Sequence, residues 1–278
     1  MAIITLTRQS GSLGDEIGML IARRLGYTFY DRKEIERRIV AKGFSPEDLA
    51  KYDERKPNIF DRWAKACERY LNYLSMVILE MAQENNCVIM GRGAFLYLSD
   101  VPNHLTIRFV STIEARLRHI KELTHIKNDD FALKMLKDSD KRQREFYKSS
   151  FQYDLKDHSR IHATINTALL NPDTMADMIA TGIKNTPPAI EEQGEQRVEE
   201  LIFAQKVANK LIFEQNLRID ELYVIVHGKT ITLRGLAAFS ATVERATTII
   251  NSEWADYEVI SEIKCVQDSH YSSKNKER

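Results

Sequence analysis

Long hydrophobic runs are missing from this sequence. None of its apolar segments approaches the roughly 20 residues that a membrane-spanning helix needs. The first residues also lack a basic segment followed by an apolar core and a small-residue cleavage site, so export is not indicated. We therefore expect a cytoplasmic protein with no transmembrane segment.

Cysteine is scarce as well. Cys67, Cys87 and Cys265 are odd in number, lie far apart and form no CxxC pair. This pattern argues against a disulfide framework and against a cysteine-rich zinc site, and favours free thiols in a reducing compartment. We predict no metal site built from protein side chains alone.

An excess of charge of one sign is also absent. Forty basic and forty acidic residues cancel, so no protein-wide positive field attracts nucleic acid. A nucleic-acid site at Lys141, Arg142, Arg144 and Lys148 is a weak alternative, because no stripe of aromatic and basic residues accompanies them. Any anion-binding site must be local.

The sequence does contain an alternation of strand-like and helical segments. Apolar runs at 2–6, 87–90 and 105–110 are each followed by apolar residues at helical spacing, and a further strand is expected at 161–166. Strands that alternate with helices form a parallel sheet covered on both faces. We predict an α/β fold for the first part of the chain.

Several helix starts can be read directly. Ser111-Thr112-Ile113-Glu114 fits a capping box, and Asn171-Pro172-Asp173 begins another helix. The region 45–85 is expected to be mainly helical. Its expected core contacts are Trp63, Tyr70, Leu74, Ile78 and Met81.

A change of composition at 185–196 marks a domain boundary, because prolines, acids and a glycine interrupt the periodicity there. Beyond it we expect a helix at 198–215, strands at 222–226 and 230–234, a helix at 241–251 and a strand at 259–266. The predicted organisation is a nucleotide-binding domain at 1–184, a linker at 185–196, a small α+β domain at 197–268 and a polar tail at 269–278.

A glycine-containing turn follows the first strand. Such a turn directs backbone N–H groups and the positive end of the helix dipole at one point, which suits a phosphate. The candidate phosphate-binding residues are Arg8, Gly11, Ser12, Gly14 and Glu16.

This turn departs from the common phosphate-loop pattern GxxxxGKS or GxxxxGKT. Arg8 stands at the first glycine of that pattern and Gly14 at the lysine, and Asp15 and Glu16 bring negative charge beside the phosphates. Arg8 is therefore the candidate to restore part of the missing charge.

The segment Gly11-Ser12-Leu13-Gly14-Asp15-Glu16-Ile17 resembles the loop of the cytidylate kinase-like family, a branch of the nucleoside monophosphate kinases with a P-loop fold. Leu13 and Asp15 are departures from the family's GSGGREI. The resemblance continues through 25–31 and through 88–94, where a strand ends in Gly91-Arg92.

Further likeness lies at 138–148, which is similar to the family's arginine-bearing lid, and at Asn166-Thr167, which looks like the strand end before its last helix. The resemblance implies ATP and Mg²⁺ as cofactors and a nucleotide as substrate. It implies catalytic roles for Arg92, Arg142 and Arg144. It also implies acceptor binding by Asp31, Arg37, Gly91 and Arg92.

The segment 226–235 resembles a BON domain, which is marked by a glycine turn followed by Val-Thr-Leu-Xaa-Gly; here Thr230-Ile231-Thr232-Leu233-Arg234-Gly235 carries that pattern. This resemblance implies a ligand, lipid or protein partner for the C-terminal domain. Gly228 and Gly235 are better explained as turn and bulge residues than as a site.

Two functions remain open from the sequence. One is ATP-dependent phosphoryl transfer to a nucleoside monophosphate such as CMP or dCMP. The other is a catalytically weak or inactive nucleotide-binding domain that senses a nucleotide and is coupled to the BON-like module. The missing lysine favours the second, and the family's arginines favour the first.

Overall fold

The computed structural model describes residues 2–49, 64–184 and 188–266. Trp63, residues 185–187 of the expected linker and the expected polar tail lie outside the described residues. The chain divides into two compact units, 1–195 and 196–278, and each is described here by itself.

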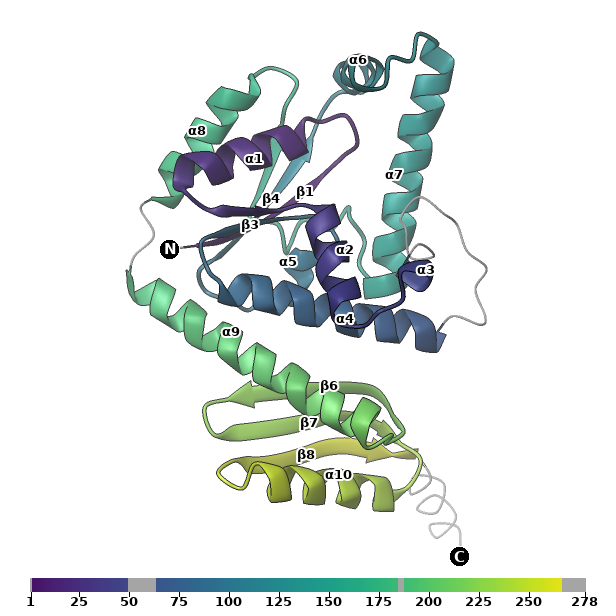
Figure 1. Cartoon of the computed structure of the whole chain (residues 1–278), viewed down its shortest axis with the longest axis vertical. Helices are drawn as coiled ribbons and strands as arrows, with labels where there is room; N and C mark the ends of the chain where they lie inside the picture. Colours follow the sequence, from purple (N-terminus) through teal and green to yellow (C-terminus); the bar gives the residue numbers. More distant parts are fainter. Residues whose placement is uncertain (1, 50–63, 185–187, 267–278) are drawn as a thin grey trace, which may run out of the picture. The chain divides into compact units, whose positions relative to one another are not determined.

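Unit 1 is built on a five-stranded sheet in the order β2-β3-β1-β4-β5 (Figure 1). All four strand pairs are parallel. The strands are β1 (Ile3–Arg8), β2 (Thr28–Tyr30), β3 (Cys87–Met90), β4 (His104–Val110) and β5 (Ala163–Asn166). The α/β prediction is confirmed, and the short edge strand β2 is an addition to it.

Helices cover both faces of this sheet. The helices of unit 1 in the described residues are α1 (Gly14–Leu25), α2 (Arg32–Ala41), α3 (Pro46–Leu49), α4 (Ala64–Gln83), α5 (Ala94–Tyr97), α6 (Ile113–Thr124), α7 (Asp129–Phe151) and α8 (Pro172–Ile183). One core joins α1 and α8 to the sheet, and Figure 1 shows α4 and α5 on the opposite face. The expected core residues Tyr70, Leu74, Ile78 and Met81 are fully buried.

The helix starts follow the sequence signals closely. The Asn171 side chain accepts a 2.8 Å hydrogen bond from the Thr174 N–H, as an N-cap residue should. The other signal is displaced by one residue, because Thr112 rather than Ser111 caps α6 by accepting from the Ala115 N–H.

The expected helices and strands of the C-terminal region are all present. They are α9 (Pro188–Asn209) with the π-helical turn η2 (Lys210–Glu214), then β6 (Ile219–His227), β7 (Thr230–Ala237), α10 (Ser240–Glu253) and β8 (Glu258–Cys265). The sheet order is β6-β7-β8, antiparallel and then parallel. Its core joins residues of α9 and α10 to all three strands.

Helix α9 begins earlier than the composition indicates. Residues 188–196, expected as linker, are helical, since proline is tolerated in a first helical turn and Glu191 suits the positive end of the dipole. Within unit 1, a Cβ on Gly194 would lie 1.9 Å from Asn103 Oδ1. The glycine therefore permits close packing of this helix rather than breaking it.

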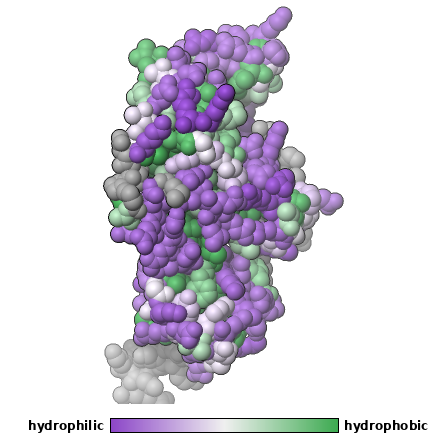
Figure 2. Space-filling view, turned by 60° about the vertical axis from the view of Figure 1, so that its left-hand side comes forward, coloured by the Kyte–Doolittle hydropathy of each residue, from purple (hydrophilic) through white to green (hydrophobic). Residues whose placement is uncertain are grey.

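None of the helices in the described ranges is long and apolar enough to cross a membrane. The face shown in Figure 2 is mainly hydrophilic, with hydrophobic residues in small separate areas. Isolated exposed hydrophobic residues of this kind are normal for folded domains.

A buried polar network joins the neighbouring strands β1 and β4. Oγ1 of Thr5 lies 2.6 Å from Nε2 of His104, and Oγ1 of Thr106 lies 3.2 Å from the same nitrogen. Burial, followed by the nearby His162, lowers the pKa of His104 from its usual 6.5 to about 3. The folded protein therefore holds this imidazole neutral.

We expect this histidine to make unit 1 acid-sensitive. Below pH 6.5 the unfolded chain binds a proton that the folded chain excludes, so the free energy of unfolding falls by about 1.4 kcal/mol per pH unit until the folded pKa is reached. Urea unfolding measures the free energy of unfolding at pH 7.5 and at pH 5.5. Between these pH values it should fall by about 1 kcal/mol more in the wild type than in His104→Gln. His158→Gln, at an exposed histidine, is the control; equal losses in all three proteins would disprove the assignment.

Candidate active site

The glycine turn places the N-terminus of α1 at the carboxyl edge of the sheet. Gly11 and Leu13 have φ of +79° and +59°, so the chain reverses through two left-handed residues. Leu13 is the N-cap of α1, and it makes no side-chain capping bond within the described residues. The first N–H groups of a helix have no intrahelical partner, so this end of α1 suits an anion.

Three backbone carbonyl groups of the turn accept hydrogen bonds from side chains of neighbouring helices. Arg116 Nε donates to Ser10 O at 2.7 Å, His119 Nδ1 to Gly11 O at 3.0 Å, and Gln143 Nε2 to Arg8 O at 3.0 Å. The donors belong to α6 and α7. With its carbonyls occupied in this way, the turn is held in one conformation by two helices.

Arg116 is the central member of this support. It is buried, and its two terminal nitrogens bind Asp140 of α7 at 2.9 and 2.7 Å in a bidentate pair. A Cβ on Gly11 would lie 2.7 Å from Arg116 O, so the glycine permits this close approach. The pair connects the turn to the helix that carries the expected lid residues.

A second strained turn follows β3. Gly91, Arg92 and Gly93 all have positive φ, at +79°, +54° and +71°. Left-handed backbone is costly for an arginine, and such strained residues cluster at active sites and ligand-binding turns. The Arg92 side chain is almost fully buried and forms an ion pair with Glu36 of α2.

The two turns enclose one cavity of about 600 Å³. Its arginines come from four elements: Arg8 at the end of β1, Arg32 in α2, Arg92 after β3 and Arg142 in α7. Four arginines around one space favour an anionic ligand, although Asp15 and Glu36 pair with three of them and offset part of their charge. Met19, Ile120 and Leu123 line the cavity with apolar surface.

The carboxylates of the loop are in different situations. Asp15 forms a bidentate pair with Arg8, with both distances 3.0 Å. Glu16 also lines the cavity, and within the described part of the chain its side chain has no hydrogen bond or ion pair. Asp15 therefore offsets the Arg8 charge, whereas Glu16 is available to a ligand.

The predicted residues Arg8, Gly11, Ser12, Gly14, Glu16, Gly91, Arg92 and Arg142 all line this cavity. Asp31, Arg37 and Arg144 are not among the lining residues. Asp31 instead caps α2, accepting a 2.8 Å hydrogen bond from the Glu34 N–H. Arg144 is exposed, since two residues along a helix turn a side chain about 200° away from Arg142.

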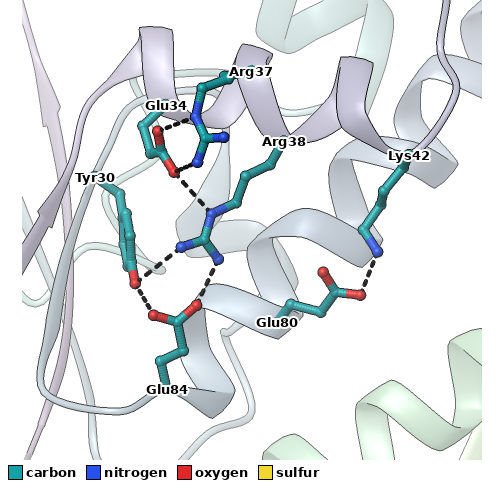
Figure 3. Close-up of polar contacts among 7 residues, drawn as sticks. All are labelled: Tyr30, Glu34, Arg37, Arg38, Lys42, Glu80 and Glu84. Atoms are coloured by element: carbon teal, nitrogen blue, oxygen red, sulfur yellow. Dashed lines mark hydrogen bonds and ion pairs between the residues drawn. The ribbon is translucent and has the colours of Figure 1, made fainter.

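Arg37 lies in a network on the other side of α2 (Figure 3). It binds Glu34 through two 2.7 Å hydrogen bonds and is 67% exposed. Arg37, followed by Arg38, lowers the pKa of Glu34 to about 2. Arg38 continues the network to Glu84 and Tyr30, so these side chains connect α2 to β2 and to the turn after α4 rather than to the cavity.

Sequence reasoning missed Arg32, Glu36, Arg116 and Gln143. Arg32 and Glu36 carried a usable signal, since residues four apart share one face of a helix. The roles of Arg116 and Gln143 depend on contacts more than 100 residues away in sequence, and no local pattern indicates them. Within the described ranges, no group of three or more histidine, cysteine, aspartate or glutamate residues is arranged to hold a metal ion.

Comparison with known proteins agrees with this architecture. Over 150 residues the chain is 25% identical to the cytidylate kinase of Methanocaldococcus jannaschii, covering 53% of this chain and 84% of that protein. The fold is similar to that of a crystallised, uncharacterised protein from Eubacterium ventriosum, with a TM-score of 0.52 and 21% identity over 66% of this chain and 99% of that one.

The model of the cytidylate kinase-like family matches residues 3–169, more than half of the chain and nearly all of the sheet and helices that enclose the cavity. This chain belongs to the cytidylate kinase-like family.

Proposed function

We propose that unit 1 transfers the γ-phosphoryl group of ATP to a nucleoside monophosphate such as CMP or dCMP. The observation that supports this best is the single cavity in which the N-terminus of α1 meets arginines from four elements. Phosphoryl transfer needs positioning and charge stabilisation rather than a covalent nucleophile, and this cavity offers both.

The glycine turn is the proposed donor site. The N–H groups at the start of α1 bind the ATP phosphates, and Arg8 supplies the cation that a lysine supplies in the common loop. A Cβ on Gly91 would lie 3.3 Å from Arg8 Nη1, so this guanidinium lies between the two turns. Arg8 can therefore contact phosphates on either side.

Mg²⁺ fits the same loop through Glu16. Magnesium prefers oxygen ligands, and it commonly binds through one or two carboxylates together with the phosphates of the substrate. Glu16 presents such a carboxylate at the cavity. When bound, the ion neutralises charge on the β- and γ-phosphates.

In the reaction, an oxygen of the acceptor phosphate bonds to the γ-phosphorus while the bond to the β–γ bridging oxygen breaks, and the electron pair leaves with ADP. Arg92 and Arg142 are the proposed catalytic residues, because a planar guanidinium binds two phosphate oxygens and stabilises charge that spreads in the transition state. The products are ADP and a nucleoside diphosphate.

A second candidate function is nucleotide sensing without turnover. The Arg8–Asp15 pair favours it, since this carboxylate neutralises the cation that would otherwise bind the donor phosphates. Binding would survive through the backbone N–H groups, while charge stabilisation in the transition state would be weak.

The test is an ADP-release assay with ATP, Mg²⁺ and a panel of ribo- and deoxyribonucleoside monophosphates. We expect acceptor-dependent turnover that falls roughly 100-fold or more in Arg142→Ala. Arg144→Ala is the matched control, an exposed arginine one helical half-turn away, and it should retain wild-type turnover. Absence of turnover with nucleotide binding intact would reject the kinase and leave the sensor.

For unit 2 we propose a BON-like domain with a ligand, lipid or protein partner, since its elements follow one another in the order of that pattern. The division into a nucleotide-binding domain and a smaller C-terminal domain is part of the same proposal. So is a cytoplasmic location, where ATP and nucleoside monophosphates are found together.

A further inference from the structure

Strand β4 carries a buried arginine that the proposed mechanism does not use. Arg108 is only 8% exposed, and within the described ranges its guanidinium makes no hydrogen bond or ion pair. Burial lowers the pKa of Arg108 from its usual 12.5, but arginine side chains stay protonated in proteins. A buried charge without a partner costs folding free energy, so its presence calls for a functional explanation.

Arg108 lies near the carboxyl edge of the sheet, close to the cavity. It is in parallel register with Thr7 of β1, so the two side chains share one face of the sheet. Thr7 directly precedes Arg8, which lines the cavity. Asp140 of α7 acts on Arg108 electrostatically, and Gln143, three residues further along that helix, lines the cavity as well. The field of Arg108 therefore reaches a ligand in the cavity with little screening, because the charge is buried.

The groups around Arg108 do not neutralise it. Oγ1 of Thr7 is buried too, and among the described residues it has no hydrogen-bond partner. Both carboxylate oxygens of Asp140 are already bound by Arg116, at 2.9 and 2.7 Å. Burial raises the pKa of the nearby Tyr153 above its usual 10, so this phenol is neutral near pH 7. The protein leaves the positive charge of Arg108 uncompensated.

The cavity has little other net charge to attract phosphates. Four arginines line it, and three carboxylates lie in it or pair with its lining: Asp15, Glu16 and Glu36. The carboxylates offset three of the arginines, which leaves one positive charge in this set. Arg108 adds a second. This matters because Gly14 stands at the position of the lysine that cradles phosphates in the common loop.

We propose that Arg108 is an electrostatic residue of the site, whose buried and uncompensated charge strengthens the binding of phosphate groups in the cavity without touching them. The identity of the ligands rests on the proposed function, and Arg108 is an addition to its mechanism. Two consequences follow. Removing the charge weakens a ligand more strongly the more negative that ligand is, and it leaves unit 1 no less stable.

Arg108→Met tests the first consequence, because methionine keeps an unbranched apolar side chain and removes the charge. Calorimetry without Mg²⁺ measures three ligands of decreasing charge: inorganic triphosphate, CMP and the neutral nucleoside cytidine. We expect triphosphate to bind roughly tenfold more weakly than to the wild type, CMP roughly threefold more weakly, and cytidine equally well. Arg118→Met, at an exposed arginine of α6, is the matched control and should change each affinity by less than about twofold.

Urea unfolding tests the second consequence and separates an electrostatic role from a structural one. Replacing an unpaired buried charge by an apolar side chain should leave the urea midpoint unchanged or raise it. Loss of an arginine that supports the fold would lower the midpoint instead. A lower midpoint, failure of Arg108→Met to fold, or a loss of cytidine affinity equal to that of triphosphate overturns the inference.

The ADP-release assay distinguishes failure of this inference from failure of the proposed function. If the wild type turns over and Arg108→Met binds triphosphate as tightly as the wild type does, the inference fails and the kinase stands. If the wild type shows no turnover but Arg108→Met loses triphosphate affinity as expected, the kinase fails and the role of Arg108 stands. If the wild type binds neither CMP nor triphosphate, both are rejected.

Discussion

Gly14→Lys, which installs the lysine of the common phosphate loop, is expected to lower ATP affinity at least tenfold rather than raise it. A Cβ at this position would lie 2.6 Å from the Arg8 Cβ and 2.9 Å from its Cγ. Contacts that short force Arg8 out of its place. The backbone itself is no obstacle, because Gly14 is not among the residues with positive φ.

The informative variant is the double substitution Arg8→Gly with Gly14→Lys. It removes the obstructing side chain and moves the cation to its usual position in phosphate loops. We expect the ATP affinity of the double variant to recover toward the wild-type value. Arg8→Gly alone should bind ATP roughly 10- to 100-fold more weakly than the wild type. The four proteins form a double-mutant cycle with a favourable coupling free energy between the two positions.

Calorimetric titration with ATP and Mg²⁺ measures the cycle, and thermal unfolding confirms that each variant folds. If Gly14→Lys alone binds ATP more tightly than the wild type, Arg8 does not stand in for the lysine. In that case the Arg8–Asp15 pair is only a support of the turn, and the sensor becomes the better account of this family member.

The sequence predicted strand bounds best for strands that are buried on both faces of the sheet. Strand β3 coincides with the predicted run, and β4 begins one residue earlier than predicted, because uninterrupted apolar runs are typical of buried parallel strands. Strand β2 has three residues and an exposed Thr28, so it carries no such pattern. It exists because β3 offers it a parallel partner.

The same contrast holds within the site. The position of Gly11, Gly14 and Arg92 around one cavity was predictable, because each belongs to a turn directly after a strand and the carboxyl ends of parallel strands meet at one edge. The family resemblance assigned Arg37 to the acceptor site through its offset from Asp31. An offset along the chain does not say which face of a helix a side chain takes, and Arg37 is not among the residues that line the cavity. Arg116 was missed because its partners, Ser10 and Asp140, come together only in the folded unit.

Arg116→Ala is expected to cause the largest loss of stability among the surface and site variants considered. Removing one member of a buried ion pair leaves the other without compensation, and such losses reach roughly 3 kcal/mol. The Asp140 side chain retains 23% exposure, so water relieves part of that cost. The substitution also frees the Ser10 carbonyl and empties a buried volume beside the glycine turn.

Urea unfolding and ATP titration on the same preparations check this expectation. Arg118→Ala, at an exposed arginine of the same helix, is the control and should change the free energy of unfolding by less than about 0.5 kcal/mol.

Asp140→Asn separates the two roles of the Arg116 guanidinium, because it weakens the ion pair and leaves the hydrogen bond to Ser10 in place. If ATP affinity falls in Arg116→Ala and not in Asp140→Asn, the contact with the turn matters for binding and the contact with α7 matters for stability. If the two variants lose ATP affinity equally, the position of α7 itself controls the phosphate loop. Equal stability of Arg116→Ala and Arg118→Ala would contradict the buried pair as a support of the site.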